Sequence, residues 1–214
     1  PYKRTFYTGF LGELNFENKY SSLFVNLRCM TVNDSIATIF VGGGITKESN
    51  ENKEWEETIA HELFHQWFGD LVTAESWSNL TVNESFADYS QTLWEEHSKG
   101  KDAGEYENYK GLRNYLSSPA DAEKDLVRFY YKDREDMFDL VSYQKGGRVL
   151  NMLRHYVGDE AFYASLNKYL TDNQFKNGSA IKLKLAFEAV TGKDMNWFFN
   201  QWYFGSGHPY VRIT

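Results

Sequence analysis

The sequence is poor in cysteine, proline and histidine, with one, three and five of these residues among 214. The single cysteine, Cys29, excludes an internal disulfide and a zinc site built from several thiolates, so imidazole and carboxylate groups remain as metal ligands. No stretch approaches the roughly 20 apolar residues that a helix needs to cross a bilayer. We therefore expect neither a membrane span nor a cysteine-based metal site.

Basic residues are also in the minority, with 23 lysines and arginines against 30 aspartates and glutamates. The resulting net charge of -7 opposes binding to nucleic acid and to anionic membrane surfaces. Hydrophobic residues make up 42% of the chain, which is enough for a sizeable core. We expect a soluble globular protein with no nucleic-acid or membrane partner. Its compartment stays unknown, because a cytoplasmic and an exported (periplasmic) location both fit.

Two patterns divide the chain. Apolar and polar residues alternate over residues 1–45, which predicts strands, whereas apolar residues recur at helical spacing over residues 52–68 and from residue 83 onward. These patterns predict an α+β fold. A small N-terminal mixed β-sheet lobe covers about residues 1–50, a mostly helical lobe covers 51–205, and a following strand starts within 206–214. Because both ends have strand-like patterns, we expect a fragment of a longer polypeptide with additional domains.

Glycines and capping residues predict several helix boundaries. Gly158 is expected to end one helix, and Asp159 to cap the next. Ser179 is expected to begin a further helix that ends at Gly192. Asp194 is expected to cap the last helix.

The segment His61-Glu62-Leu63-Phe64-His65 places two imidazoles four residues apart. On a helix this spacing brings both rings to the same face, one turn apart, near enough to bind one metal ion. The alternative interpretation is a pair of hydrogen-bonded histidines on a buried helix. With only five histidines in the chain, the spacing favours a metal site.

A catalytic zinc generally takes three protein ligands, so a third donor must come from elsewhere in the chain. Glu84 is the candidate, because the intervening residues 66–83 are long enough for a loop and the start of a second helix. Asp88 follows one helical turn later, where it could accept a hydrogen bond from the non-ligating nitrogen of a zinc histidine. The alternative for Asp88 is a solvated helix carboxylate.

Three motifs together resemble those of the gluzincin zinc aminopeptidases, a family that includes alanyl and leucyl aminopeptidases and leukotriene hydrolase. They are the segment at 61–73, the segment at 83–87 with the preceding Trp77 and Leu80, and the segment at 142–150. The resemblance covers roughly residues 30–210. It implies a thermolysin-like catalytic domain that binds one zinc ion per chain and takes peptide substrates. It also implies that Tyr143 is the catalytic tyrosine, whereas composition alone would favour core packing for a tyrosine.

One family motif departs from its usual form. Family members carry a G-x-M-E-N segment whose glutamate binds the free amino group of the substrate. Here the corresponding stretch is residues 29–40, and a gap-free alignment places Asp34 at the position of that glutamate. Asp34 is therefore a candidate for binding the substrate amine, and the alternative is a turn or strand-edge residue.

The motifs predict hydrolysis of peptide bonds by zinc-activated water, with removal of N-terminal amino acids as the leading hypothesis. Glu62 is expected to be the general base that takes a proton from water and returns it to the leaving amine. The Tyr143 hydroxyl is expected to stabilise the oxyanion. A zinc endopeptidase or other zinc hydrolase of the same fold is the second hypothesis, because the amine-binding motif is altered. A non-catalytic binding module is the third.

Overall fold

The computed structural model describes residues 3–7, 27–31, 37–40, 56–210 and 212, and the chain forms two compact units. Unit 1 is Pro1–Leu63 and unit 2 is Phe64–Thr214. Each unit is described by itself below. The predicted lobe boundaries near residues 50 and 205, and the strand within 206–214, stay predictions.

Three short strands in unit 1 form one sheet. They are β1 (Lys3–Tyr7), β2 (Leu27–Thr31) and β3 (Ala37–Phe40), in the order β1-β2-β3. The alternating sequence pattern is thus confirmed for β1 and β3. Both described pairs are antiparallel, so the prediction of a mixed sheet is wrong for these strands. Alternation predicts which side chains share a face, but it does not specify the direction of the neighbouring strand.

Unit 2 is mostly helical, with one small parallel sheet. The sheet pairs β4 (Val72–Ala74) with β5 (Lys176–Gly178). The α-helices are α3 (Thr81–Lys99), α4 (Lys101–Leu116), α5 (Gly146–Val157), α6 (Asp159–Asn173), α7 (Ala180–Thr191) and α8 (Asn196–Trp202). Three 3₁₀-helices, η1 (Trp77–Asn79), η2 (Pro119–Glu123) and η3 (Arg134–Met137), and a π-helix, η4 (Val141–Lys145), complete it.

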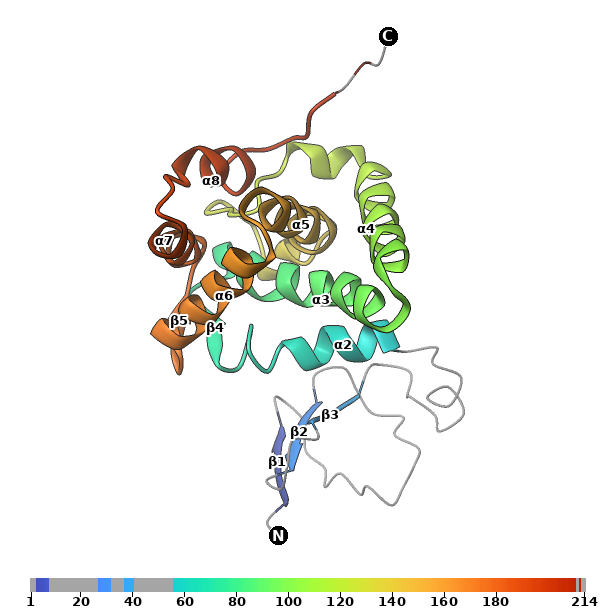
Figure 1. Cartoon of the computed structure of the whole chain (residues 1–214), viewed down its shortest axis with the longest axis vertical. Helices are drawn as coiled ribbons and strands as arrows, with labels where there is room; N and C mark the ends of the chain where they lie inside the picture. The colour runs from blue at the N-terminus through green and yellow to red at the C-terminus, as the bar shows by residue number, and fades with distance from the viewer. Residues whose placement is uncertain (1–2, 8–26, 32–36, 41–55, 211, 213–214) are drawn as a thin grey trace. The chain divides into compact units, whose positions relative to one another are not determined.

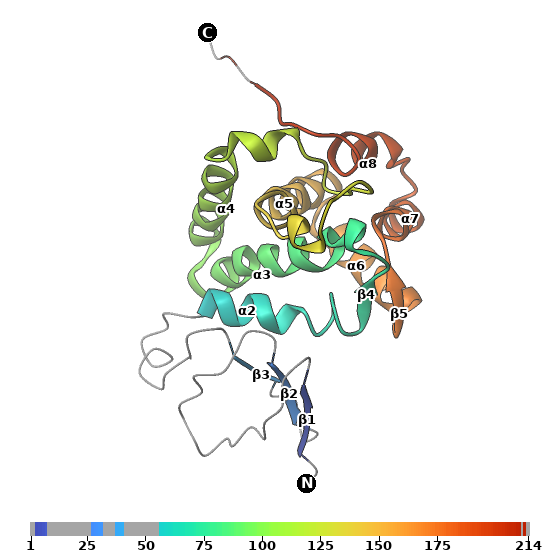
Figure 2. The same ribbon diagram turned by 180° about the vertical axis from the view of Figure 1, so that it is seen from behind.

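Within unit 2, α5 is the central helix. Figures 1 and 2 show it from opposite sides, surrounded by α3, α4, α6, α7 and α8. This place agrees with its burial, because Val149, Leu150 and Leu153 are at most 2% exposed. η4 leads directly into α5, so its last residues adjoin the central helix of unit 2.

The core of unit 2 is rich in aromatic side chains. Phe68 stacks on Phe86 of α3 with ring centroids 4.0 Å apart, and both rings are almost fully buried. Burying a phenylalanine side chain stabilises a fold by about 1.5–3 kcal/mol. The core therefore anchors the segment that follows α2 (Glu56–Phe64), the helix of the predicted metal motif.

The predicted helix ends are confirmed with two corrections. Gly158 and Gly192 follow α5 and α7 with φ of 86° and 67°, a region that favours glycine. The Ser179 hydroxyl caps α7. Asp194 is not the N-cap of α8, which is Met195, but its carboxylate accepts the N–H of Asn196 at the start of that helix. The prediction that Asp159 caps α6 is wrong, because its carboxylate instead binds the guanidinium of Arg154.

Among the described helices, none combines the length and the apolar character that crossing a membrane requires.

Candidate metal centre

The helix that carries the predicted metal motif ends earlier than the sequence predicts. α2 spans Glu56–Phe64, whereas helical spacing continues to Phe68. After α2, the N–H groups of residues 70–72 bond to the carbonyl oxygens of residues 65–67, five positions back. These wider turns end the α-helix and place His65 in the first turn after it. Periodicity does not distinguish the two kinds of turn, so the sequence overestimates the helix.

The backbone after α2 depends on a glycine. A Cβ on Gly69 would lie 2.7 Å from the carbonyl oxygen of His65, which is too close for any side chain. The same carbonyl oxygen accepts the N–H of Asp70 at 2.8 Å. Gly69 therefore allows the chain to fold back tightly against His65.

His65 is oriented by a backbone hydrogen bond. Its ring is buried, and Nδ1 lies 3.0 Å from the carbonyl oxygen of Phe68. Because a carbonyl oxygen only accepts, Nδ1 carries the proton and Nε2 presents its lone pair. Nε2 lies 3.3 Å from Oε2 of Glu84. A backbone oxygen thus selects the tautomer that a metal ligand needs.

Glu84 lies in the first turn of α3. The positive end of the helix dipole stabilises a carboxylate at this position. Its side chain is 13% exposed, so the carboxylate lies in a largely buried environment beside His65. The eighteen residues between His65 and Glu84 fold into the turn after α2, strand β4, the 3₁₀-helix η1 and the start of α3.

His61, His65 and Glu84 form one group. Each offers a ligand atom, and these three atoms lie within 4.8 Å of one another. Zinc binds nitrogen at about 2.0–2.1 Å and carboxylate oxygen at about 2.0–2.2 Å, so tetrahedral ligand atoms lie roughly 3.3–3.5 Å apart. The group is therefore of the right size and chemistry to hold zinc. Two imidazoles and one carboxylate also leave a fourth position for water or substrate.

The predicted base and the predicted amine-binding residue are Glu62 and Asp34. Glu62 lies on α2 next to His61 and is half-buried, and its predicted role as a base stays a prediction. Asp34, the candidate for binding the substrate amine, lies outside the described residues.

Tyr143 lies on the π-helix η4 and is half-buried. The N–H of Lys145 bonds to the carbonyl oxygen of Leu140, five residues back, which is the π pattern. The Ser85 hydroxyl donates to the carbonyl oxygen of Ser142 at 2.6 Å. Since Ser85 follows Glu84 and Ser142 precedes Tyr143, this bond joins the two segments that carry predicted site residues.

Asp88 also joins these two segments. Its Oδ1 accepts from Gln144 at 2.9 Å, and its Oδ2 accepts from Arg148 at 3.2 Å. The side chain is buried, with Asp88 only 4% exposed, so the alternative of a solvated carboxylate is wrong. The hydrogen bond that Asp88 is expected to accept from a zinc histidine stays a prediction.

Sequence reasoning missed the contacts that bring α3 and η4 together. A Cβ on Gly146 would overlap the Ser85 side chain, and a Cβ on Gly147 would overlap the Asp88 carboxylate. Two adjacent glycines within a helical stretch were the available signal, because glycine destabilises a helix unless close packing requires it.

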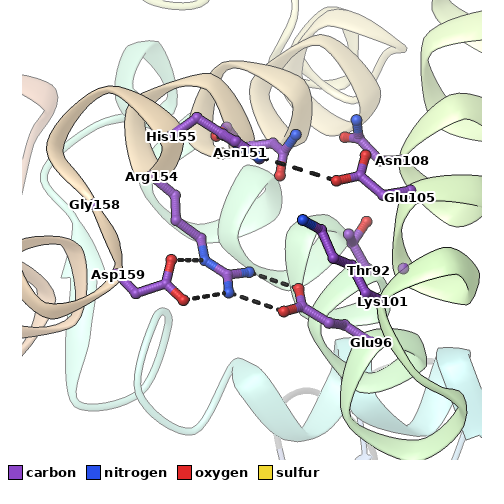
Figure 3. A pocket seen from close by; sticks show the side chains of 11 residues that line it. Thr92, Glu96, Lys101, Glu105, Asn108, Asn151, Arg154, His155, Gly158 and Asp159 are labelled. Atoms are coloured by element: carbon purple, nitrogen blue, oxygen red, sulfur yellow. Dashed lines mark hydrogen bonds and ion pairs between the residues drawn. The ribbon is translucent and has the colours of Figure 1, made fainter.

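A separate polar pocket of about 350 Å³ lies where α3, α4, α5 and α6 meet (Figure 3). Arg154 projects between Glu96 and Asp159, and it forms paired hydrogen bonds with each carboxylate. These three residues are called the Arg154 cluster. These bonds hold the pKa of Glu96 and of Asp159 below their usual values, and they join three helices. The two carboxylates of the Arg154 cluster are thus engaged in an ion-pair network.

The spacing of His61 and His65 is that of the H-E-x-x-H motif of zinc metallopeptidases, and the structure groups Glu84 with them. A model of the peptidase family M1 domain matches residues 29–202. The chain belongs to peptidase family M1. The resemblance to the gluzincin aminopeptidases is thereby confirmed at the level of the family.

Relatives and solved structures agree with this assignment. Aminopeptidase M1 of Arabidopsis thaliana is 34% identical over 172 residues, which are 75% of this chain and 19% of the relative. The M1 zinc metallopeptidase of Deinococcus radiodurans, in a variant bound to a Tyr-Ser-Ala substrate, is similar with a TM-score of 0.63. It shares 29% identity, over 72% of this chain and 34% of that one.

Leukotriene A4 hydrolase of Saccharomyces cerevisiae shares the fold. Its TM-score is 0.67 at 22% identity, over 79% of this chain and 29% of that one. The chain spans about a fifth of the length of the curated relatives it matches.

Proposed function

We propose that this chain is the zinc-binding catalytic domain of an aminopeptidase. In this proposal His61, His65 and Glu84 hold one zinc ion, Glu62 is the general base, and the Tyr143 hydroxyl stabilises the oxyanion. The observation that carries the proposal is the grouping of the three ligand atoms within 4.8 Å. The order and spacing of these residues in a chain of family M1 support it.

A zinc ion supplies Lewis-acid chemistry, since it polarises a carbonyl and makes a water molecule easier to deprotonate. Glu62 follows His61 directly on α2, so its carboxylate is attached close to the metal ligands. It takes the proton of the attacking water and later gives it to the leaving amine. General acid–base catalysis of this kind contributes about 100- to 10,000-fold in rate.

Tyr143 donates a hydrogen bond to the oxygen that becomes negative as the tetrahedral intermediate forms. A donor placed at such an oxygen lowers the barrier by about 3–4 kcal/mol. The bond between Ser85 and Ser142 supports this role, because it ties the segment of Tyr143 to the helix of Glu84.

Exopeptidase specificity is supported by the relatives. Aminopeptidase M1 of Arabidopsis thaliana is named for this activity, and the Deinococcus radiodurans enzyme binds a short peptide, Tyr-Ser-Ala. In this proposal Asp34 pairs with the free amino group of the substrate. Since the chain spans about a fifth of the relatives' length, we infer that additional domains of the same polypeptide contribute to the substrate pocket.

The test compares free and N-acetylated peptides of the same sequence on the complete zinc-loaded protein. An aminopeptidase cleaves the free peptide at least about 100-fold faster, because acetylation removes the charge that the proposed carboxylate partner binds. Equal rates on both peptides would instead assign the chain to the endopeptidases, which is the candidate favoured by Asp34 in place of glutamate.

A second arm tests catalysis itself. Glu62→Gln retains the ligands, so one zinc per chain is expected with turnover reduced at least about 100-fold. Glu62→Gln with unchanged turnover removes Glu62 as the base. A wild-type protein that binds zinc and cleaves no peptide of a varied panel is a binding module, and the enzymatic proposal is then wrong.

A further inference from the structure

The start of the π-helix η4 is fixed by one carboxylate. Oδ1 of Asp139 accepts the N–H groups of Val141 and Ser142, each at 3.1 Å. The Asp139 carbonyl oxygen also accepts the N–H of Tyr143 at 3.2 Å. A π-helix is rare and is found mostly as a single turn, frequently at functional sites. Asp139 thus sets the backbone of the turn that carries Tyr143.

Asp139 is itself bound by two cations. Arg128 donates to both carboxylate oxygens, at 2.8 and 3.2 Å, and Lys124 donates to Oδ2 at 2.8 Å. These three residues are called the Arg128 cluster. Burial by itself would raise the pKa of Asp139, but the hydrogen bonds from Arg128 and Lys124 outweigh it and hold the pKa below its usual value. The carboxylate therefore stays ionised and fixed in place at neutral pH.

Arg128 contacts the same segment at two further points. It donates to the Met137 carbonyl oxygen at 3.3 Å and to the Ser142 hydroxyl at 3.2 Å. The Ser142 hydroxyl in turn donates to the Met137 carbonyl oxygen. Residues 137–142 are thus fixed by side chains before η4 continues into α5, in addition to the backbone bonds of the turn itself.

The other side of η4 is fixed against α3. The Ser85 hydroxyl donates to the Ser142 carbonyl oxygen, and the absence of a side chain on Gly146 allows this close approach. Ser85 lies next to Glu84 on α3. η4 is therefore bound between the Arg128 cluster and the helix that carries a predicted zinc ligand.

We propose that Asp139 is a positioning residue for Tyr143, and that the Arg128 cluster fixes the distance between the Tyr143 hydroxyl and the Glu84 carboxylate. This inference rests on the proposed role of Tyr143. The competing explanation is that Asp139 only caps a helix. A cap contributes stability alone, whereas a positioning residue changes the rate of the step that needs the hydroxyl.

The experiment is a double-mutant cycle in the complete zinc-loaded protein. Asp139→Ala is expected to lower kcat about 10- to 100-fold with KM within about 2-fold, because a transition-state contact is misplaced. In a Tyr143→Phe background the same change is expected to lower kcat less than about 3-fold further, because the hydroxyl is already gone. Equal losses in both backgrounds would overturn the proposal.

Conservative variants give a second test if Asp139→Ala does not fold. Asp139→Asn keeps an oxygen that accepts the two N–H groups, so it is expected to retain kcat within about 5-fold. Ser85→Ala removes the bond on the opposite side and is expected to lower kcat about 5-fold or more, again only when the tyrosine is present. An Asp139→Asn loss that is the same with and without Tyr143 refutes positioning.

Two controls separate this inference from the proposed function. Glu96→Ala changes a carboxylate that also binds an arginine but lies in the Arg154 cluster, so kcat is expected to stay within about 2-fold. If Tyr143→Phe alone leaves kcat unchanged, the proposed role of Tyr143 is wrong and the inference falls with it. If Tyr143→Phe lowers kcat but the cycle is additive, only the inference is wrong.

Discussion

Two arginine clusters in unit 2 differ in how fully they use their guanidinium groups. All five N–H groups of Arg154 donate hydrogen bonds, to Glu96, Asp159 and Tyr89. The terminal nitrogens of Arg128 also donate, but its Nε is buried with no hydrogen-bond partner among the described residues. The fully satisfied cluster lies at the ends of helices, and the incompletely satisfied one lies at the start of η4, the segment that carries Tyr143.

The difference indicates what each cluster is for. A buried donor without a partner destabilises a fold by about 1–3 kcal/mol. Arg148, which binds Asp88 near the site, has a buried Nε in the same condition within the described part of the chain. Proteins break local rules of this kind mainly at functional sites. We infer that Arg128 and Arg148 place functional segments, whereas the Arg154 cluster joins α3, α5 and α6 away from η4.

The largest expected effect compares two carboxylates of α3. Glu84→Ala removes a proposed ligand, so we expect zinc to be lost and kcat/KM to fall at least about 1,000-fold. Glu96→Ala removes a carboxylate of the Arg154 cluster and should retain one zinc per chain. Metal analysis after dialysis, together with peptidase assays, measures both. A Glu84→Ala protein that keeps its zinc would contradict the ligand assignment.

The next prediction compares the two arginines directly. Arg128→Met leaves the partly buried Asp139 without its main partner, so the free energy of unfolding should fall by about 3–5 kcal/mol and kcat should fall with it. Arg154→Met should lower the free energy of unfolding by only about 1–2 kcal/mol with kcat unchanged, because Asp159 is mostly exposed to solvent.

Urea denaturation and kcat at saturating substrate measure the two effects. Should Arg154→Met reduce kcat as much as Arg128→Met, the division of roles between the clusters would be wrong.

A pH experiment sharpens the comparison further. Burial lowers the pKa of Lys145 to about 8. In Lys124, burial is outweighed by the hydrogen bonds that the ammonium donates to Asp121 and Asp139, which raise its pKa. Between about pH 8 and 10.5 the unfolded state then binds the additional proton at Lys145, so stability should rise with pH. Lys145→Met should remove this rise, which amounts to about 1–3 kcal/mol.

Lys124→Met is the matched control. Its stabilisation is present below the unfolded pKa and is lost only as pH rises through the raised folded pKa, so the rise between about pH 8 and 10.5 should persist in this variant. Denaturation midpoints at a series of pH values measure the slope. An unchanged slope in Lys145→Met would show that folding does not lower the pKa of this lysine.

The smallest expected effect is that of Asp159→Asn. This carboxylate is 68% exposed, so its pairing with Arg154 is screened by solvent. We expect a loss of about 0–1 kcal/mol in the free energy of unfolding and no change in kcat. A loss as large as that of Arg128→Met would mean that the exposed pair contributes like a buried one.

The sequence predicts the local part of the site well. His61 and His65 are separated by one helical turn, and the interval before Glu84 allows the chain to return, so spacing alone predicts the three candidate ligands that the structure groups together. Helix ends at Gly158 and Gly192 were also predictable, because glycine adopts their backbone angles readily.

The parts of the fold and of the candidate site that the sequence did not predict depend on contacts between residues far apart in the chain. Ser85 and Ser142 are 57 residues apart, and no periodic pattern encodes their hydrogen bond. The π-helix η4 has the same apolar spacing as an α-helix over so short a stretch, so its wider turn was not predicted. Asp139 precedes that turn without any motif, and its role emerges only from the position of Arg128.

Phe68 by itself connects the hydrophobic interior to His65, a proposed metal ligand. Its ring stacks on Phe86, while its carbonyl oxygen orients His65. Loosening of the interior therefore releases the imidazole, and a bound ion in turn opposes melting. Each tenfold increase in free zinc above the dissociation constant should add about 1.4 kcal/mol to stability, so a chelator lowers the melting temperature of the core as it removes the ion.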